Sequence, residues 1–119
     1  MNIDKISKIT GLSSHTLRYY EKIGLILNVK RDSKGHRDYS KEDVAWIEFL
    51  KRLKATGMSL GNIKKFAEYR YKGDATIQNR LDLLEMHYSW INQNIDNMLK
   101  HREKIEEKIE IYKNWSNNS

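Results

Sequence analysis

The chain has 119 residues, a length that allows one small domain or one domain with an appendage. It has 22 Lys and Arg against 16 Asp and Glu, and the resulting net charge of +6 suits a polyanionic partner. The absence of cysteine excludes disulfides, thiolate metal sites and cysteine catalysis, and the absence of proline favours uninterrupted helices. Neither a long apolar stretch nor a signal-peptide pattern occurs, which predicts a cytoplasmic protein that does not span a membrane.

The first 24 residues predict two short helices joined by a tight turn. Isoleucine recurs at every third position over residues 3–9, and Gly11 follows as a residue typical of a helix C-terminus. Ser13 or Ser14 can cap the second helix. Two helices around such a turn match a helix-turn-helix, and a generic helical hairpin is the alternative.

A basic β-hairpin is predicted next. Residues 25–31 are rich in β-prone side chains, residues 32–35 offer a turn ending in Gly35, and residues 36–39 can return as the second strand. The hairpin carries four basic residues, Lys30, Arg31, Lys34 and Arg37. A basic hairpin directly after a helix-turn-helix is typical of a DNA-binding wing.

Two further helices complete the predicted core of this unit. Ser40 and Asp43 have the spacing of a capping box and start a helix that Gly57 ends. Ser59 caps the following helix. Its predicted inner face consists of Leu60, Ile63, Phe66 and Ala67.

The rest of the chain predicts one long helix with a heptad seam. Apolar residues alternate at spacings of four and three over 36 residues, interrupted only by Arg102, and at a rise of ~1.5 Å per residue this seam is roughly 54 Å long. A 72-residue domain cannot cover so long a stripe, which predicts a coiled-coil dimer, with a helix folded back on its own domain as the alternative. The dimerisation residues are Ile77, Leu81, Leu84, Tyr88, Ile91, Ile95, Met98, Ile105, Ile109 and Tyr112.

Charge divides the chain in the same way. Residues 1–72 hold 16 basic and 8 acidic side chains, net +8, whereas residues 73–119 hold 6 and 8, net −2. We therefore expect a DNA-binding domain over 1–72, a dimerisation helix over 73–112 and a short tail over 113–119.

One known pattern extends over nearly the whole chain. It is carried by residues 10–13, 16–21, 24–26, 31, 35–39, 53–60, 73–74, 80 and 83–85. In these residues the sequence resembles the MerR family of transcription regulators. The resemblance implies a mostly α fold, a winged helix-turn-helix followed by a long antiparallel coiled-coil dimerisation helix. It also implies a homodimer that binds a palindromic promoter operator and distorts the DNA for RNA polymerase, in response to an effector.

The chemistry of the exposed side chains agrees with this expectation. Arg18 can make a bidentate contact to guanine or phosphate, Tyr19 can donate to phosphate, and Tyr39 can join or support the arginines of the wing. The predicted DNA-contacting residues are Ser14, His15, Thr16, Arg18, Tyr19, Lys30, Arg31, Lys34, His36, Arg37, Tyr39, Lys54 and Ser59.

The sequence departs from the family pattern at three points, which change what we expect of the wing, of the sensing chemistry and of the effector site. Leu27 and Asn28 stand where the family usually has proline, which predicts a less rigid wing entry. Without cysteine, thiolate metal sensing and thiol redox sensing are excluded, and no cofactor or metal is expected. Only residues 113–119 follow the seam, so any small-molecule effector is expected to bind the dimer itself.

Two interpretations remain for His87 and His101: they are solvated side chains, or they form a weak Zn²⁺ or Ni²⁺ site.

Other functional classes fit less well. No arrangement of nucleophile, paired carboxylates or phosphate-binding loop predicts an enzyme. A DNA-architectural protein, similar to excision factors with this small winged fold, is the alternative function. A coiled-coil adaptor whose basic half binds another protein explains the seam but not the wing.

Overall fold

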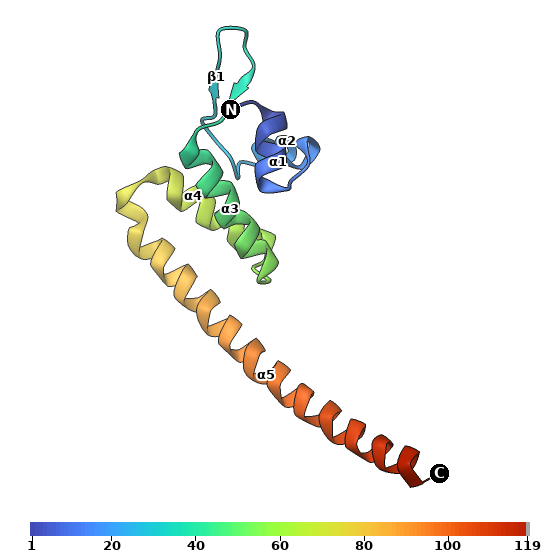
Figure 1. Ribbon diagram of the computed structural model, residues 1–119. Helices are drawn as coiled ribbons and strands as arrows, with labels where there is room; N and C mark the ends of the chain where they lie inside the picture. Colours follow the sequence, from blue (N-terminus) through green and yellow to red (C-terminus); the bar gives the residue numbers. More distant parts are fainter. Residues whose placement is uncertain (119) are drawn as a thin grey trace. The chain divides into compact units, whose positions relative to one another are not determined.

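The computed structural model describes residues 1–118 and is mostly helical, with five α-helices, one 3₁₀ turn and one two-stranded hairpin (Figure 1). The chain forms two units, Met1–Leu83 and Leu84–Ser119. The first holds the hairpin and four of the helices, and the second is the greater part of the long helix α5. Over residues 1–118, no helix combines the length and the apolar character needed to cross a membrane.

Local capping defines the first two helices. Helix α1 spans Ile3–Thr10 and ends at Gly11, whose φ of 74° lies in the left-handed region that glycine tolerates. Helix α2 spans Ser14–Lys22, and the side chain of Ser13 accepts a hydrogen bond from the backbone N–H of Thr16. The predicted turn and the Ser13 cap are confirmed. Ile6 and Leu17 are fully buried between the helices of this unit.

The hairpin is present but shorter than predicted. Strand β1, Lys30–Arg31, pairs antiparallel with β2, Arg37–Asp38. Residues 25 and 26 do not join the strand, because the N–H groups of Leu25 and Ile26 both donate to the carbonyl of Tyr20 at the end of α2. Their side chains are buried in the core, so the apolar run at 25–26 reflects burial and not β-structure.

Helices α3, Lys41–Ala55, and α4, Leu60–Lys72, form the rest of the core. The Ser40–Asp43 capping box is confirmed, and so is the Ser59 cap of α4. The rings of Trp46 and Phe66 stack at a centroid distance of 5.9 Å and join the two helices. The prediction that Leu60 belongs to the inner face is wrong. Leu60 is 46% exposed, because it is the first residue of α4 and lines the edge of a groove.

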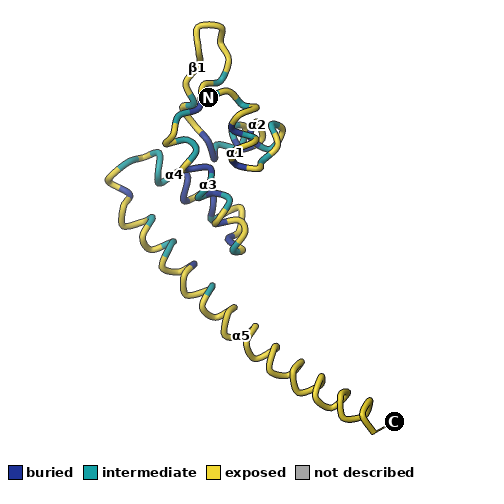
Figure 2. Tube along the Cα trace, in the orientation of Figure 1, coloured by how far each residue is buried: buried dark blue, intermediate teal, exposed yellow. Residues whose placement is uncertain are grey.

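A 3₁₀ turn at Asp74–Thr76 leads into α5, Ile77–Asn118. This single helix of 42 residues includes all predicted seam positions and continues past Tyr112. Figure 2 shows that its C-terminal half is exposed on all sides. Eight of the ten predicted seam residues are exposed, namely Ile77, Leu81, Tyr88, Ile95, Met98, Ile105, Ile109 and Tyr112.

The entry to the wing has a local structure that proline cannot adopt. Asn28 has a φ of 61°, the only positive φ outside glycine in residues 1–118, and the N–H of Leu27 donates to the hydroxyl of Tyr71 at 2.9 Å. Proline fixes φ near −65° and has no N–H, so it fits neither position. A tertiary hydrogen bond therefore holds the segment where the family usually has proline.

We expect Asn28→Pro to lower the free energy of unfolding by about 2–3 kcal/mol, because the wing entry must leave its left-handed conformation. Asn28→Gly is the matched control and should change stability by less than about 0.5 kcal/mol, since glycine accepts the same φ. Urea denaturation of both variants measures the difference. Equal midpoints for the proline and glycine variants would contradict the assigned conformation.

Candidate nucleic-acid interface

The first part of the candidate site is the exposed face of α2. Buried Leu17 and Tyr20 fix the rotation of the helix about its axis, so His15, Arg18 and Tyr19 lie on its outer face. Tyr19 is 44% exposed although it is aromatic. These three side chains can hydrogen-bond to phosphates or base edges, which is the role predicted for them.

Two other predicted contacts of α2 are partly used by the fold. The hydroxyl of Ser13 donates to that of Thr16 at 3.0 Å, which makes Thr16 part of the helix cap. Ser14 and Thr16 are both half-buried. The N-terminus of α2 thus combines a fixed cap with exposed side chains one turn later.

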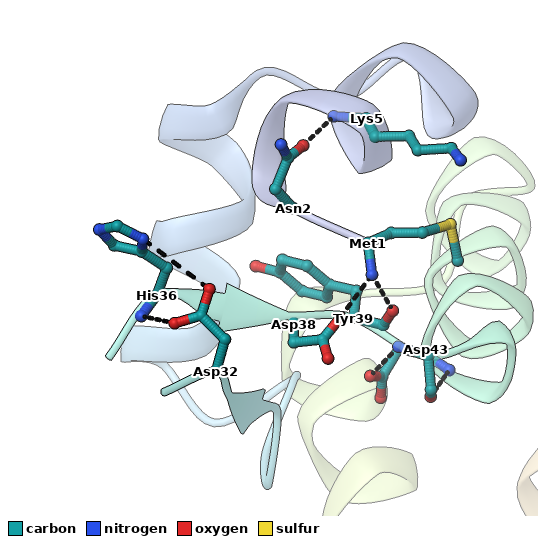
Figure 3. Close-up of polar contacts among 9 residues, drawn as sticks. Met1, Asn2, Lys5, Asp32, His36, Asp38, Tyr39 and Asp43 are labelled. Atoms are coloured by element: carbon teal, nitrogen blue, oxygen red, sulfur yellow. Dashed lines mark hydrogen bonds and ion pairs between the residues drawn. The ribbon is translucent and has the colours of Figure 1, made fainter. Parts of the chain in front are cut away.

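The tip of the wing is ordered by one aspartate. The Oδ1 atom of Asp32 accepts hydrogen bonds from the N–H groups of Lys34 and His36, each at 2.9 Å. The bond from His36 is the largest cause that lowers the pKa of Asp32 below its ordinary value. Figure 3 shows the Asp32 carboxylate beside His36. The exposed basic side chains and histidine of the wing are those of Lys30, Arg31, Lys34 and His36, and the exposed acidic ones are Asp32 and Asp38.

Glu21 links α2 to the wing. Its carboxylate accepts a hydrogen bond from Arg37 Nε at 2.7 Å through Oε2 and one from the Tyr39 hydroxyl at 3.0 Å through Oε1. Arg37 lies opposite Arg31 in the β-ladder, so turning Arg37 inward to Glu21 relieves the repulsion of two facing like charges. The wing is therefore fixed to the helix that carries Arg18.

This network changes the interpretation of two predicted contacts. Tyr39 is only 2% exposed, so of its two predicted roles only the support of the arginines fits the structure. Burial, and then the neighbouring carboxylate of Glu21, raise the pKa of Tyr39 far above its ordinary value, which keeps its hydroxyl a donor. Arg37 is half-buried and paired, and less available to DNA than Arg31.

Sequence reasoning assigned no role to Glu21. The signal that was available is its spacing, four residues after buried Leu17, which places it on the inner face of α2. A carboxylate on an inner face needs a cation or donors, and the wing supplies both.

The first residue of the chain also contacts the wing. The ammonium group of Met1 donates to Asp38 Oδ1 at 2.6 Å and to the carbonyl of Tyr39 at 2.8 Å, and the N–H of Tyr39 donates to the carbonyl of Met1 at 2.7 Å (Figure 3). These bonds attach the segment before α1 to the end of β2. The wing is thus held by the segment before α1 as well as by α2.

The α3–α4 corner supplies the last predicted contacts. Within residues 1–118, the exposed ammonium group of Lys54 has no ion-pair partner. Ser59 Oγ caps α4 by accepting from the N–H of Asn62 at 3.2 Å. Lys54 and Tyr19 line the same groove, so the structure brings this corner together with the outer face of α2. No group of three or more potential metal ligands occurs among the described residues.

Replacing the linking carboxylate is expected to destabilise the wing. In Glu21→Gln, Arg37 and Tyr39 both lose a charged acceptor, and one of them faces the amide NH2 group, which cannot accept a hydrogen bond. We expect this to lower the free energy of unfolding by about 1–3 kcal/mol. Glu68→Gln is the matched control, because Glu68 pairs with Lys72 on an exposed surface and should contribute less than about 0.5 kcal/mol. Denaturation midpoints and amide exchange of residues 37–39 measure both. Equal effects of the two substitutions would show that Glu21 does not link α2 to the wing.

Comparison with known proteins gives a consistent result. The family model described as MerR HTH family regulatory protein matches residues 1–70. An uncharacterised HTH-type transcriptional regulator of Haemophilus influenzae is 40% identical over 108 residues, which cover 91% of this chain and 80% of that protein.

Two solved structures are similar over almost the whole chain. The first, HiNmlR, is a MerR family regulator that lacks the sensor domain and was crystallised bound to promoter DNA. It has a TM-score of 0.86 and 38% identity, covering 94% of this chain and 89% of that one. The second is a MerR family regulator from Listeria monocytogenes, with a TM-score of 0.88 and 31% identity, covering 94% of this chain and 85% of that one.

Proposed function

The chain belongs to the MerR family of helix-turn-helix regulatory proteins, and from this premise we propose that it acts as a homodimer on a palindromic promoter operator. It is a transcriptional regulator, not an enzyme, and we propose that it controls transcription by distorting the DNA. The observation that carries the proposal is the fixed juxtaposition of two basic elements. Glu21 holds the wing against α2, whose outer face presents Arg18. Similarity to a regulator bound to promoter DNA supports it.

Each element has a distinct part in DNA binding. Arg18, with His15 and Tyr19, reads base edges or phosphates from α2 in the major groove. The exposed cations of the wing bind the flanking backbone, and Lys54 adds a phosphate contact from the α3–α4 corner. Since the Glu21 network fixes the angle between wing and helix, both contacts fall on the DNA with a fixed separation.

The exposed seam of α5 is proposed to pair with a second copy in antiparallel orientation. Exposed apolar residues at spacings of four and three cannot be left in water along a whole helix, and a partner helix of the same pattern covers them. An antiparallel pair places one DNA-binding unit at each end of the coiled coil. Two units related by a two-fold axis match a palindromic operator.

Two antiparallel registers keep the largest part of the heptad seam paired. One places Ile95 against the partner's Met98, and the other places Ile91 against the partner's Ile95. The two copies of Leu99 lie five positions apart along the helix axis in the first register and twelve in the second, so the first brings them closer and better accounts for an exposed leucine outside the seam. We propose the first register for this reason.

Single cysteines distinguish the registers cleanly, because the chain has no cysteine of its own. With a short bis-maleimide, Leu99→Cys is expected to give cross-linked dimer in the first register. Asn92→Cys should cross-link only in the second register, in which residue 92 faces its own copy. Denaturing gels measure both yields. Efficient cross-linking of the Asn92 variant alone would overturn the assignment.

The function itself is tested on the protein's own upstream DNA. We expect a palindromic footprint between promoter elements, and transcription by RNA polymerase on the same template should change when the protein is added. Permanganate reactivity within the footprint reports untwisting of the DNA. Protection confined to an integration site, with no effect on transcription, would favour a DNA-architectural protein.

A further inference from the structure

A groove lies in the first unit between α2, the end of α3 and the start of α4. Its volume is about 310 Å³, which is within the range of small-molecule sites. Five buried side chains form its floor, namely Tyr20, Leu25, Leu50, Met58 and Ile63. The floor is therefore apolar and preformed by the core.

The rim of the groove is different in character. Tyr19 and Leu60 are each more than 40% exposed, and Lys54 is exposed and has no ion-pair partner in the described part of the chain. No acidic residue lines the groove. The site therefore combines an apolar floor with one cation and one phenol at its mouth, a complement to a small molecule with an apolar body and a single negative charge.

We propose that this groove binds a small apolar carboxylate, whose hydrocarbon body lies on Leu50, Met58 and Ile63 and whose carboxylate accepts from Lys54 at the rim. The volume is too small for a helix but fits one ring with branched substituents. A small apolar carboxylate is the class of ligand that uses both the apolar floor and the ammonium group of Lys54. A neutral molecule leaves this ammonium group unpaired, and a cationic molecule is repelled by it.

Such a ligand would weaken DNA binding. Lys54 and Tyr19 are also proposed DNA contacts, so carboxylate and phosphate compete for the same donors. This coupling rests on the proposed function, whereas occupancy of the groove does not. The groove thus gives the DNA-binding unit itself a route for direct inhibition by a metabolite-sized acid.

Methionine methyl NMR tests the groove on the intact protein. Met58 lines the groove, whereas Met1, Met86 and Met98 do not and serve as internal references. With 4-tert-butylbenzoate as the probe, we expect a saturable shift of the Met58 methyl signal alone. The uncharged 4-tert-butylbenzamide should bind about threefold to tenfold more weakly, because it loses the charge-assisted contact.

Matched variants assign the charge. Lys54→Met should lower the affinity for the carboxylate to that of the amide, whereas Lys65→Met, an exposed lysine of α4 outside the groove, should leave both unchanged. An unmoved Met58 signal, or equal affinities for acid and amide, would overturn the proposal. A Met58 signal that shifts on dilution without probe would show instead that a second copy fills the groove.

The regulatory consequence is measured separately by fluorescence anisotropy of labelled operator. The carboxylate should raise the apparent Kd for DNA by more than the amide does at equal occupancy. A protein that binds the probe but no promoter DNA would leave the ligand site standing and contradict the proposed function. A protein that binds promoter DNA but not the probe would contradict the ligand site alone.

Discussion

Raising the salt concentration from 50 to 200 mM is expected to weaken operator binding by about 10³–10⁵-fold, if the dimer makes about 6–10 phosphate contacts. The physical cause is release of counterions from DNA when lysine and arginine neutralise phosphates. The first unit supplies enough cations for this, since Arg18, Lys30, Arg31, Lys34 and Lys54 are all exposed. Anisotropy titrations at several salt concentrations give the slope. A binding constant that hardly changes would refute the electrostatic basis of the interface.

Arg18→Ala should abolish specific operator binding, measured by the same anisotropy titrations. Arg18 projects from the outer face of α2, where no ion pair restrains it among residues 1–118, so its loss removes a direct base or phosphate contact without disturbing the core. Arg52→Ala is the control, an exposed arginine of α3 outside the proposed contacts. Sedimentation should show an intact dimer for both. A variant that lost assembly together with binding would give Arg18 a structural role.

The parts of the fold that the sequence predicted are those that local interactions determine. Gly11, Ser13 and Ser59 act within one helical turn, so the residue type and its spacing are enough to place a helix boundary. The capping box at Ser40 is equally local. The exposed residues of α2 can be predicted as well, because the buried side chains of Leu17 and Tyr20 determine which face of the helix is outward.

The parts that escaped prediction depend on contacts far apart in the chain. Glu21 meets Arg37 and Tyr39 only after the hairpin has folded against α2, so no local pattern shows that Tyr39 is buried. The bond from Leu27 to Tyr71 crosses 44 positions. The apolar run at 25–26 has the same composition in a strand as in a core segment, and only the hydrogen bonds to Tyr20 distinguish them.

The groove also lay beyond sequence reasoning. Its floor is built from three helices and two connecting segments. Periodicity identifies these residues only as core positions and does not show that they line a groove. Leu60 is the informative exception. Its spacing from Ile63 predicts burial, yet the start of α4 leaves it at the rim, where an apolar side chain can only be covered by something other than its own core.

A single charge in the seam is expected to separate the dimer. Ile95→Asp places an aspartate against the partner's Met98 in the proposed register, and symmetry places a second one at the equivalent contact. An uncompensated buried charge costs about 3–5 kcal/mol, which corresponds to a dimer Kd raised by at least about 10²–10⁴-fold. Operator affinity should fall with it, because a monomer reaches only one half-site. Sedimentation and operator anisotropy measure the two effects.

The matched control is Gln93→Asp, which adds the same charge two residues away on the same helix. Gln93 is exposed and bonds only to Asn97 in the structure's described residues, and its heptad position points away from the seam. We therefore expect this variant to remain a dimer that binds the operator. If both aspartates dissociate the dimer, general charge repulsion is the cause, and if neither does, α5 does not pair through the seam. Dissociation by the Ile95 variant alone requires that the exposed apolar face of a 42-residue helix is an interface between two copies.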